Sequence, residues 1–241
     1  MKKLETVRIA GALLVVMTLI SLGGCAEMSQ MMESGGSPTG QPSESKLARA
    51  VKESLELGST RAADLLSQAG GYQNSPVYRI KLPESVQPIA SRLRQFGLGG
   101  QIDQIEKLMN EGAEHAAVEA KALFVSTVRQ MTVTDALGIV TGSNTAATEY
   151  FRQHTEADLR LRYQPIIKSN LQKIGFYSQY ERLLSAYNKL PVANKPNLDL
   201  EQHVLTQSLN ALFTQVGEEE KAIRKDPMGR GSSAIAAVFG R

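Results

Sequence analysis

The sequence predicts an all-α protein, a multi-helix bundle of about eight to ten helices with at most a minor extended segment near residues 76–82. Apolar residues recur at intervals of three and four from Lys46 onward, which is the helical period. No stretch alternates apolar and polar residues for long enough to form a sheet. The composition, 42% hydrophobic, 21% charged and 5% aromatic, is that of a globular protein with a mainly aliphatic core.

The first 24 residues have the pattern of an export signal. Residues 1–8 are basic, and residues 9–22 form an apolar run that is shorter than the about 20 residues of a membrane span. Residues 22–25 (LGGC) then resemble the lipobox of bacterial lipoproteins, in which the cysteine is diacylated and the chain is cut before it. Cys25 is the one cysteine of the chain. Because two or three acyl chains anchor a protein firmly, we expect lipid attachment at Cys25.

The residues after the cysteine predict where the protein resides. Ala26 follows the cysteine, and by resemblance to the sorting rule of Gram-negative bacteria this favours an outer-membrane lipoprotein facing the periplasm. The stretch up to residue 45 is rich in Ser, Gly, Pro and Gln, so we expect a flexible tether of roughly 25 Å. The predicted organisation is a signal peptide over 1–24, the lipidated cysteine and tether over 25–45, and a single helical domain over 46–241.

The charge argues against nucleic acid as a partner. The formal net charge is +3, and the leader supplies two of these three charges because it carries Lys2, Lys3 and Arg8 against Glu5. The mature chain is therefore close to neutral, whereas a nucleic-acid surface needs a concentrated basic face. We expect no nucleic-acid partner and, because no cofactor-binding motif is present, no cofactor.

The helical part begins with two helices and a connector. An apolar stripe over residues 47–55 predicts a first helix, with Gly58 as its stop. A Ser-Thr pair then opens a second helix over residues 59–69, which ends at Gly70. We expect residues 72–83 to be an extended connector, because β-prone residues there lead up to a proline.

Glycines and prolines divide the next segment. A helix begins near Glu84, which places Pro88 in its first turn, where proline is tolerated. The glycine-rich residues 97–100 end it. Apolar spacing over 102–131 predicts two helical runs, with Gly112 loosening the helix.

Capping signals punctuate the middle of the chain. Residues 132–135 (TVTD) predict the cap of a short helix that ends at residues 141–142. Ser143 or Asn144 is expected to cap the following helix. Residues 155–158 (TEAD) repeat the capping pattern and predict the start of another, longer helix.

The last third of the domain repeats the helix-and-stop pattern. Residues 176–187 predict a helix, and residues 191–197 a loop. Asp199 is expected to cap a long helix that residues 226–227 (DP) stop. An amphipathic turn over residues 234–239 is expected to dock on the core.

Motifs spread along the domain resemble one bacterial family. The residues that carry the resemblance are Met131-Thr132, Asp135-Ala136, Gly142, Ala146-Ala147-Thr148, Tyr150-Phe151, Thr155, Pro165-Ile166-Ile167, Leu212-Phe213, Glu219-Glu220, Ile223-Arg224, Pro227 and Val238-Phe239-Gly240. The family is the domain of unknown function DUF4197, whose members look like exported, mainly helical proteins, many with a lipobox. The resemblance implies a fold and a location but no activity. This chain departs from the family at residues 110–114, which read NEGAE in place of a smoother NRAAE run.

Polar residues cluster around the two short turns near residues 135–150, and there are two interpretations of them. Each fits a cap or a turn. Alternatively, they line a polar pocket where helix N-termini converge and present free N–H groups to an anion. These candidate binding residues are Asp135, Thr141, Gly142, Asn144, Thr148 and Tyr150.

Other polar patterns have both a chemical and a structural interpretation. Glu111, His115 and Glu119 share one helical face, which could bind a divalent metal if other helices added carboxylates, or could be a solvated face. His154 and Asp158 are four apart and could form an acid–base dyad or stabilise a turn. We predict no metal site, because the diiron and zincin patterns are absent.

We expect a lipid-anchored, periplasm-facing helical module that binds another component of the cell envelope. Residues 218–224 fit this picture as an exposed, salt-bridged helix face. The alternative is a small-ligand-binding or enzymatic domain with the polar pocket near 135–150. No nucleophile motif is present, so the sequence favours a protein that is not an enzyme without settling the question.

Overall fold

The computed structural model describes residues 43–189 and 199–240. The predicted signal peptide, Cys25, nearly all of the tether and the loop 191–197 lie outside these residues. Within them the protein is all-α, as predicted, with eight α-helices, two short turns of other helix types and no strand. The α-helices are α2 (Glu44–Leu66), α3 (Gln87–Leu93), α4 (Gly99–Gln130), α5 (Ala136–Thr141), α6 (Ala146–Lys173), α7 (Phe176–Asn188), α8 (Leu200–Lys225) and α9 (Ser233–Phe239).

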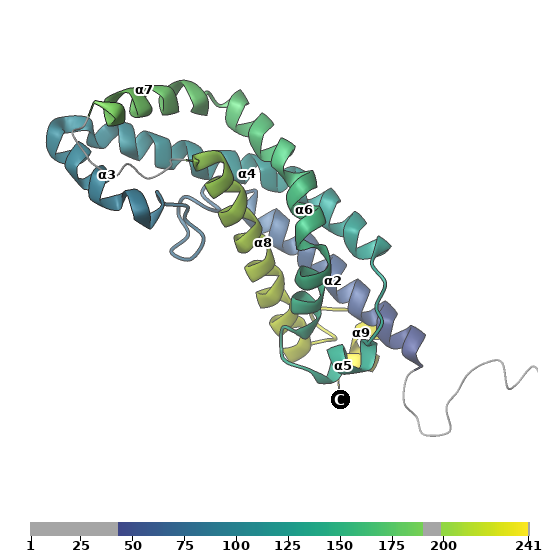
Figure 1. The fold of residues 1–241 in the computed structure, drawn as a ribbon. Helices are drawn as coiled ribbons and strands as arrows, with labels where there is room; N and C mark the ends of the chain where they lie inside the picture. Colours follow the sequence, from purple (N-terminus) through teal and green to yellow (C-terminus); the bar gives the residue numbers. More distant parts are fainter. Residues whose placement is uncertain (1–42, 190–198, 241) are drawn as a thin grey trace, which may run out of the picture. The chain divides into compact units, whose positions relative to one another are not determined.

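Four long helices form the body of the helical unit and alternate in direction (Figure 1). At one end, here called the base, the start of α2 lies beside the end of α4, because Lys52 Nζ donates to the Arg129 carbonyl at 2.8 Å. The start of α6 lies beside the end of α8 at the same end, where the N–H of Ala147 donates to Glu220. This up-down-up-down order is that of an antiparallel four-helix bundle.

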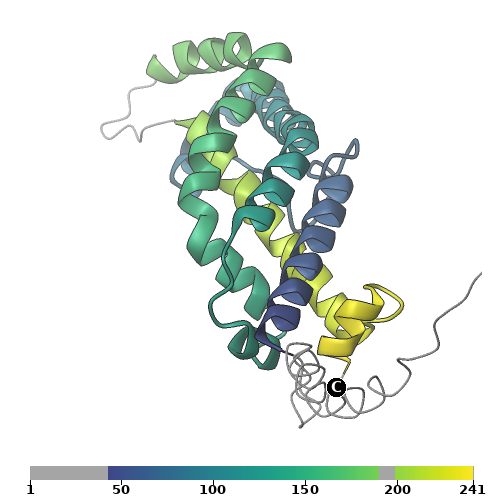
Figure 2. The ribbon, with the colours of Figure 1, turned by 90° about the vertical axis from the view of Figure 1, so that its right-hand side faces the viewer.

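The short helices cover the two ends of the bundle. α5 and α9 lie at the base, while α3 and α7 lie at the opposite end (Figures 1 and 2). In α9 the buried side chains of Ile235 and Val238 face the bundle, so this terminal helix docks on the core as predicted. α7 packs on α4 and α6.

Three phenylalanines from three different long helices meet in the core. Phe124 of α4, Phe151 of α6 and Phe213 of α8 have ring centroids 5.3 to 5.8 Å apart. All three side chains are buried. Such tilted and edge-to-face pairs stabilise a core beyond the area that they bury.

Two predictions for the first half of the domain were wrong, namely the helix stop at Gly58 and the division of residues 102–131 into two helical runs. Gly58 does not stop a helix, since α2 runs through it to Leu66. Gly58 instead lies buried against Val216 of α8, and this interhelix packing outweighs its poor helix propensity. Gly112 does not divide α4 either, which is one helix of 32 residues. It lies close to Leu171 of α6, where a Cβ atom would be 2.5 Å from the leucine side chain.

Two predicted caps in the middle of the chain were also wrong. Residues 155–158 do not open a helix, because α6 runs from residue 146 to 173, and the Thr155 hydroxyl donates to the Phe151 carbonyl within it. The start of α6 is not capped by Ser143 or Asn144. A carboxylate of α8 accepts the N–H groups there instead.

Other predicted boundaries are confirmed. Asp135 caps α5 by accepting from the Gly138 N–H, and Asp199 caps α8 by accepting from the Gln202 N–H. Residues 226–227 follow the last residue of α8. The extended connector predicted over 72–83 was wrong for its first half, where residues 72–74 and 76–78 form turns, whereas residues 79–83 carry no turn. A turn with Gly97 at φ +82° separates α3 from α4.

Candidate binding groove

Three polar side chains lie buried along one face of α4. Glu106, Asn110 and Glu114 are spaced four residues apart and have exposed fractions of 8%, 0% and 5%. We call them the α4 polar stripe. Buried polar groups are costly unless they are hydrogen-bonded, so each must have a partner.

Glu114 holds the first part of the connector. Its Oε1 atom accepts the backbone N–H groups of Tyr72 and Gln73, both at 3.1 Å. The Tyr72 ring is fully buried, and its hydroxyl donates to the Ser208 carbonyl of α8 at 3.3 Å. Burial raises the pKa of the Tyr72 hydroxyl far above its usual value, so this group stays a neutral donor.

Asn110 and Glu106 hold the last part of the connector. Asn110 accepts the Ile80 N–H and donates to the Ile80 carbonyl, both at 2.8 Å. Glu106 accepts the Leu82 N–H at 3.1 Å and has its second oxygen 3.8 Å from the Arg79 guanidinium. The side chains of a helix therefore satisfy the backbone of a segment that has no neighbouring strand.

The spacing of the stripe explains why this works. Four residues of α-helix advance about 6 Å, and two residues of extended chain advance about 6.6 Å. Asn110 and Glu106, four apart on α4, consequently match Ile80 and Leu82, two apart on the connector, whereas Glu114 bonds the turn at Tyr72 and Gln73. Exposure also alternates along the connector, since Ile80 and Leu82 are buried while Arg79 and Lys81 are exposed. This is the alternation of an extended chain.

The connector forms one wall of a groove that is open to solvent. The groove has a volume of about 1190 Å³ and is lined by residues between Gln73 and Gln87 and by His203 and Gln207 of α8. His203 Nε2 donates to the Lys81 carbonyl at 2.8 Å, which joins the two walls. The loop before Arg79 is fastened by Tyr78, whose hydroxyl donates to Gln215 of α8 at 2.8 Å. The walls are thus held in place by hydrogen bonds.

A separate apolar cavity lies behind the same connector. Its volume is about 20 Å³, and apolar side chains of the connector, α3, α4, α7 and α8 line it. This is room for about one water molecule, and the lining offers no polar partner to hold one. The cavity is therefore a packing defect rather than a ligand site.

The second buried polar centre lies at the base. Glu220 of α8 has an exposed fraction of 2%. Its carboxylate accepts the N–H groups of Ala147 and Thr148 at 3.0 and 2.8 Å and the Thr148 hydroxyl at 2.6 Å. A negative charge is favoured at a helix N-terminus, so Glu220 caps α6 from another helix.

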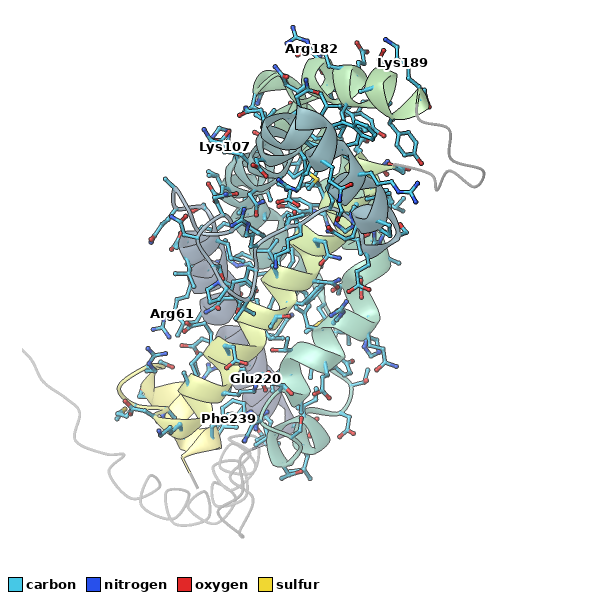
Figure 3. All side chains as sticks on the ribbon, turned by 90° about the vertical axis from the view of Figure 1, so that its left-hand side faces the viewer. Arg61, Lys107, Arg182, Lys189, Glu220 and Phe239 are labelled. Carbon is cyan, nitrogen blue, oxygen red and sulfur yellow. The ribbon has the colours of Figure 1, made fainter. Side chains whose placement is uncertain are left out.

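Arg224 neutralises this buried carboxylate and ties in two further helices. Its guanidinium lies 2.8 Å from Glu220 and donates to the carbonyls of Ile139 and Val140 near the end of α5. Its charge also lies 4.6 Å from the centroid of the Phe239 ring in α9. Figure 3 shows Glu220 and Phe239 close together at the base. The predicted exposed face over 218–224 was therefore wrong for its central pair, which is buried.

The predicted polar cluster near residues 135–150 lies at this base, and its first members serve α5. Asp135 is the N-cap of α5 and Gly142 is its C-cap. The Thr141 hydroxyl donates to the Leu137 carbonyl at 2.9 Å. These groups stabilise a short helix through local hydrogen bonds.

The remaining members of the cluster serve α6 and the segment before α5. Thr148 is bonded to Glu220, and the Tyr150 hydroxyl donates to the Thr132 carbonyl at 3.0 Å. Asn144 is exposed in the turn before α6. The two N–H groups that an anion would use at the start of α6 are bonded to a carboxylate of the protein. A ligand pocket at these residues stays a prediction that no observation here favours.

The residues proposed for a metal site on one face of α4 do not come together with other ligands. Glu111 pairs with Lys107 at 3.4 Å, and Glu119 accepts from Asn170 at 3.1 Å, while His115 is exposed. Within residues 43–189 and 199–240, no three His, Cys, Asp or Glu side chains form a group that could hold a metal ion.

The acid–base dyad, one of the two interpretations of His154 and Asp158, does not form either. His154 Nδ1 lies 2.8 Å from the Tyr150 carbonyl, and its ring stacks on that of Tyr150 with centroids 4.0 Å apart. Asp158 pairs with Arg162 at 3.2 Å. Both residues stabilise α6.

Sequence reasoning missed the polar stripe and the burial of Glu220. The signal was present, because Glu106 and Asn110 fall among Ile102, Ile105 and Met109 on the apolar face of α4. A polar residue inside an apolar stripe indicates a buried partner. Which backbone groups it bonds depends on how the connector folds back, and this is a long-range property.

The helical unit matches one family model. The model for the protein of unknown function family DUF4197 covers residues 41–240. The chain belongs to the DUF4197 family. Comparisons with curated proteins and with solved structures found no significant match. Among the described residues of this DUF4197 protein, none of the helices has the length and apolar character needed to cross a bilayer.

Proposed function

We propose that this DUF4197 protein is an outer-membrane lipoprotein that faces the periplasm and binds another component of the cell envelope through the groove beside the connector. The lipobox-like residues 22–25, the apolar run before them and the solitary Cys25 support the anchor. The observation that carries the binding role is the groove itself. It is wide, polar and open, and its walls are fixed before any partner arrives.

Preorganisation is the physical reason to favour binding at this place. Ordering a loop on association costs free energy, and a loop that is already fixed does not incur that cost. The α4 polar stripe fixes the connector with four backbone N–H bonds and one carbonyl bond. A plain linker between helices does not need buried carboxylate and amide side chains to hold its backbone, so the fixed connector favours a binding role.

The anchor is tested by mass spectrometry of the protein isolated from membranes. We expect an N-terminal cysteine that carries acyl chains, and we expect Cys25→Ser to release the protein into the soluble periplasmic fraction with its fold unchanged. An unmodified Cys25, or a Cys25→Ser variant that stays in the membrane, would contradict the anchor.

The binding role is tested by site-specific photo-crosslinking in living cells. A photoreactive amino acid replaces Gln207 in the groove wall or, as the matched control, Arg182, which is exposed on α7 at the end far from the base (Figure 3). We expect one discrete crosslinked species from Gln207 and none from Arg182. Equal or absent products at both positions would overturn the assignment of the groove.

A further inference from the structure

We infer that the outer edge of the connector at Arg79 and Lys81 binds an extended peptide segment of the partner by strand pairing, with an acidic side chain of that segment opposite Lys81. This inference rests on the proposed function and specifies how the groove holds its partner. It also predicts the class of partner, namely a protein with an accessible extended acidic segment.

The backbone groups of residues 79–82 point alternately toward α4 and away from it. Successive residues of an extended chain point their N–H and C=O groups to opposite sides. Both groups of Ile80 and the N–H of Leu82 point to α4, where the polar stripe binds them, while the Leu82 carbonyl accepts from the Gln87 side chain. Those of Arg79 and Lys81 consequently point away from α4, toward the groove.

Three of the four outward groups have no hydrogen-bond partner among the described residues. In the part of the chain that the structure describes, the N–H groups of Arg79 and Lys81 and the carbonyl of Arg79 make no hydrogen bond, and only the Lys81 carbonyl is bonded, to His203. An unpaired row of backbone donors and acceptors is a template for another strand. Peptide-binding domains use such edges for affinity.

The edge is short and has defined ends. The N–H groups of Val77 and Tyr78 both donate to the Ser75 hydroxyl, so the loop before Arg79 is closed to pairing. Pro83 has no N–H group and ends the edge on the other side. Three free groups therefore remain, which suits a short peptide segment and limits pairing with a second copy of the connector.

The groove has the dimensions and shape for such a segment. Paired strands lie about 4.8 Å apart, so a bound segment would run along the connector inside the groove and end at Lys81, where the His203 side chain of α8 already bonds the carbonyl. The volume of about 1190 Å³ and the open shape fit a polypeptide better than an enclosed small molecule. Gln207 lines the far wall and offers an amide to the segment.

Charge identifies the kind of segment. Arg79 is partly neutralised by Glu106 at 3.8 Å. The exposed ammonium of Lys81 takes part in none of the ion pairs among the described residues. Glu84 lies beyond Pro83, after the edge has ended. A carboxylate of the partner opposite Lys81 would form an ion pair with this ammonium.

The test measures binding of designed peptides to the full chain purified in detergent. The probe is a fluorescein-labelled peptide of alternating Asp and Val, and its anisotropy reports binding. One control peptide has Lys in place of each Asp. Two further control peptides keep Asp and carry methyl groups on the backbone nitrogens of every second residue, so that one edge of the extended peptide is blocked in the first and the opposite edge in the second. We expect the probe to bind at least about tenfold more tightly than the Lys peptide and than one of the two methylated peptides.

Two substitutions at one position separate backbone pairing from charge. Lys81→Ala keeps the N–H and removes the ammonium, so we expect affinity to fall about threefold to tenfold. Lys81→Pro removes the N–H as well, and residue 80 lies outside any helix or turn, where a following proline is tolerated. We expect Lys81→Pro to lose at least about a further tenfold, with circular dichroism and melting temperature matching those of Lys81→Ala.

Equal binding by Lys81→Pro and Lys81→Ala, together with equal binding by the methylated and unmethylated peptides, would overturn strand pairing. If Lys81→Pro does not fold, the methylated peptides decide the question on the unmodified protein. Failure here differs from failure of the proposed function. A Gln207 crosslink without peptide binding refutes the edge alone, whereas the absence of both refutes the groove as a binding site.

Discussion

The connector and the base use the same chemistry for different ends. At the base, Glu220 accepts the first N–H groups of α6, and Arg224 neutralises it in a closed, buried arrangement. At the connector, Glu114 accepts two N–H groups and forms no ion pair among the described residues. Glu106 forms a looser ion pair than Glu220, since 3.8 Å separate it from the exposed Arg79 guanidinium. The pair at the base holds helices of the bundle together, whereas the α4 polar stripe holds the inner edge of the connector and leaves most of its outer edge unbonded.

The difference shows how a helical protein can present an extended edge without building a sheet. A strand normally needs a neighbouring strand to bond its inner edge. Here a helix supplies those bonds from side chains, so the outer edge stays unpaired at low structural cost. Substitutions that weaken one centre at a time separate the two roles.

Loss of Glu220 is expected to have the largest effect. Glu220→Ala leaves the partly buried Arg224 charge unpaired and the buried α6 N–H groups unbonded, so we expect the free energy of unfolding to fall by about 3–5 kcal/mol. Urea unfolding followed by circular dichroism measures this. The matched control is Glu218→Ala on the same helix, whose exposed pair with Lys221 should contribute only about 0–1 kcal/mol. Similar losses for the two variants would show that burial of this pair is unimportant.

Loss of Asn110 is expected to come next. Asn110→Ala leaves the buried N–H and C=O of Ile80 without partners, which we expect to cost about 2–4 kcal/mol in the same assay. Glu106→Gln keeps an oxygen for the Leu82 N–H, so it should cost about 1 kcal/mol. The account fails if Asn110→Ala is as mild as Glu106→Gln.

A pair of glycines tests whether the helices carrying these centres are packed as tightly as the structure indicates. Gly112→Ala on α4 places a Cβ 2.5 Å from Leu171, so we expect a loss of about 1–3 kcal/mol. Gly58→Ala on α2 meets Val216 at an ordinary 3.5 Å and should gain about 0.5–1 kcal/mol from helix propensity. Opposite signs are the expected result, and a gain at both positions would contradict the close approach of α4 and α6.

The smallest effect is expected at the exposed end of the base. Asp135→Ala removes the cap of α5 and should cost about 1 kcal/mol. Asn144→Ala, in the exposed turn nearby, should change stability by less than about 0.5 kcal/mol. A thermal-melting comparison of the two variants suffices, and an equal effect would mean that the Asp135 cap contributes nothing.

The sequence predicts the fold class well because helical spacing is a local property. Caps such as Asp135 and Asp199 could also be predicted, since each bonds an N–H three residues away. The errors arose where packing between distant helices decides. Gly58 and Gly112 both face another helix, and only Gly112 is packed too closely for a Cβ. The Thr155 pattern resembles a cap, but its hydroxyl bonds within a helix that continues.

The candidate site was harder to predict for the same reason. Its walls come from the connector and from α8, which lie more than a hundred residues apart in the chain, as the bond between His203 and Lys81 shows. The sequence did predict an extended connector. It did not predict that side chains of α4 would bind one edge of it, because those contacts depend on register between a helix and a loop.

Amide hydrogen exchange of the free protein, followed residue by residue with NMR, distinguishes the two edges of the connector. An N–H that is bonded within the protein exchanges slowly, and one that is open to water exchanges quickly. We predict slow exchange at Ile80 and Leu82 and fast exchange at Arg79 and Lys81. Uniform protection of all four amides, or fast exchange at Ile80 and Leu82, would contradict a connector that is bound on one edge and free on the other.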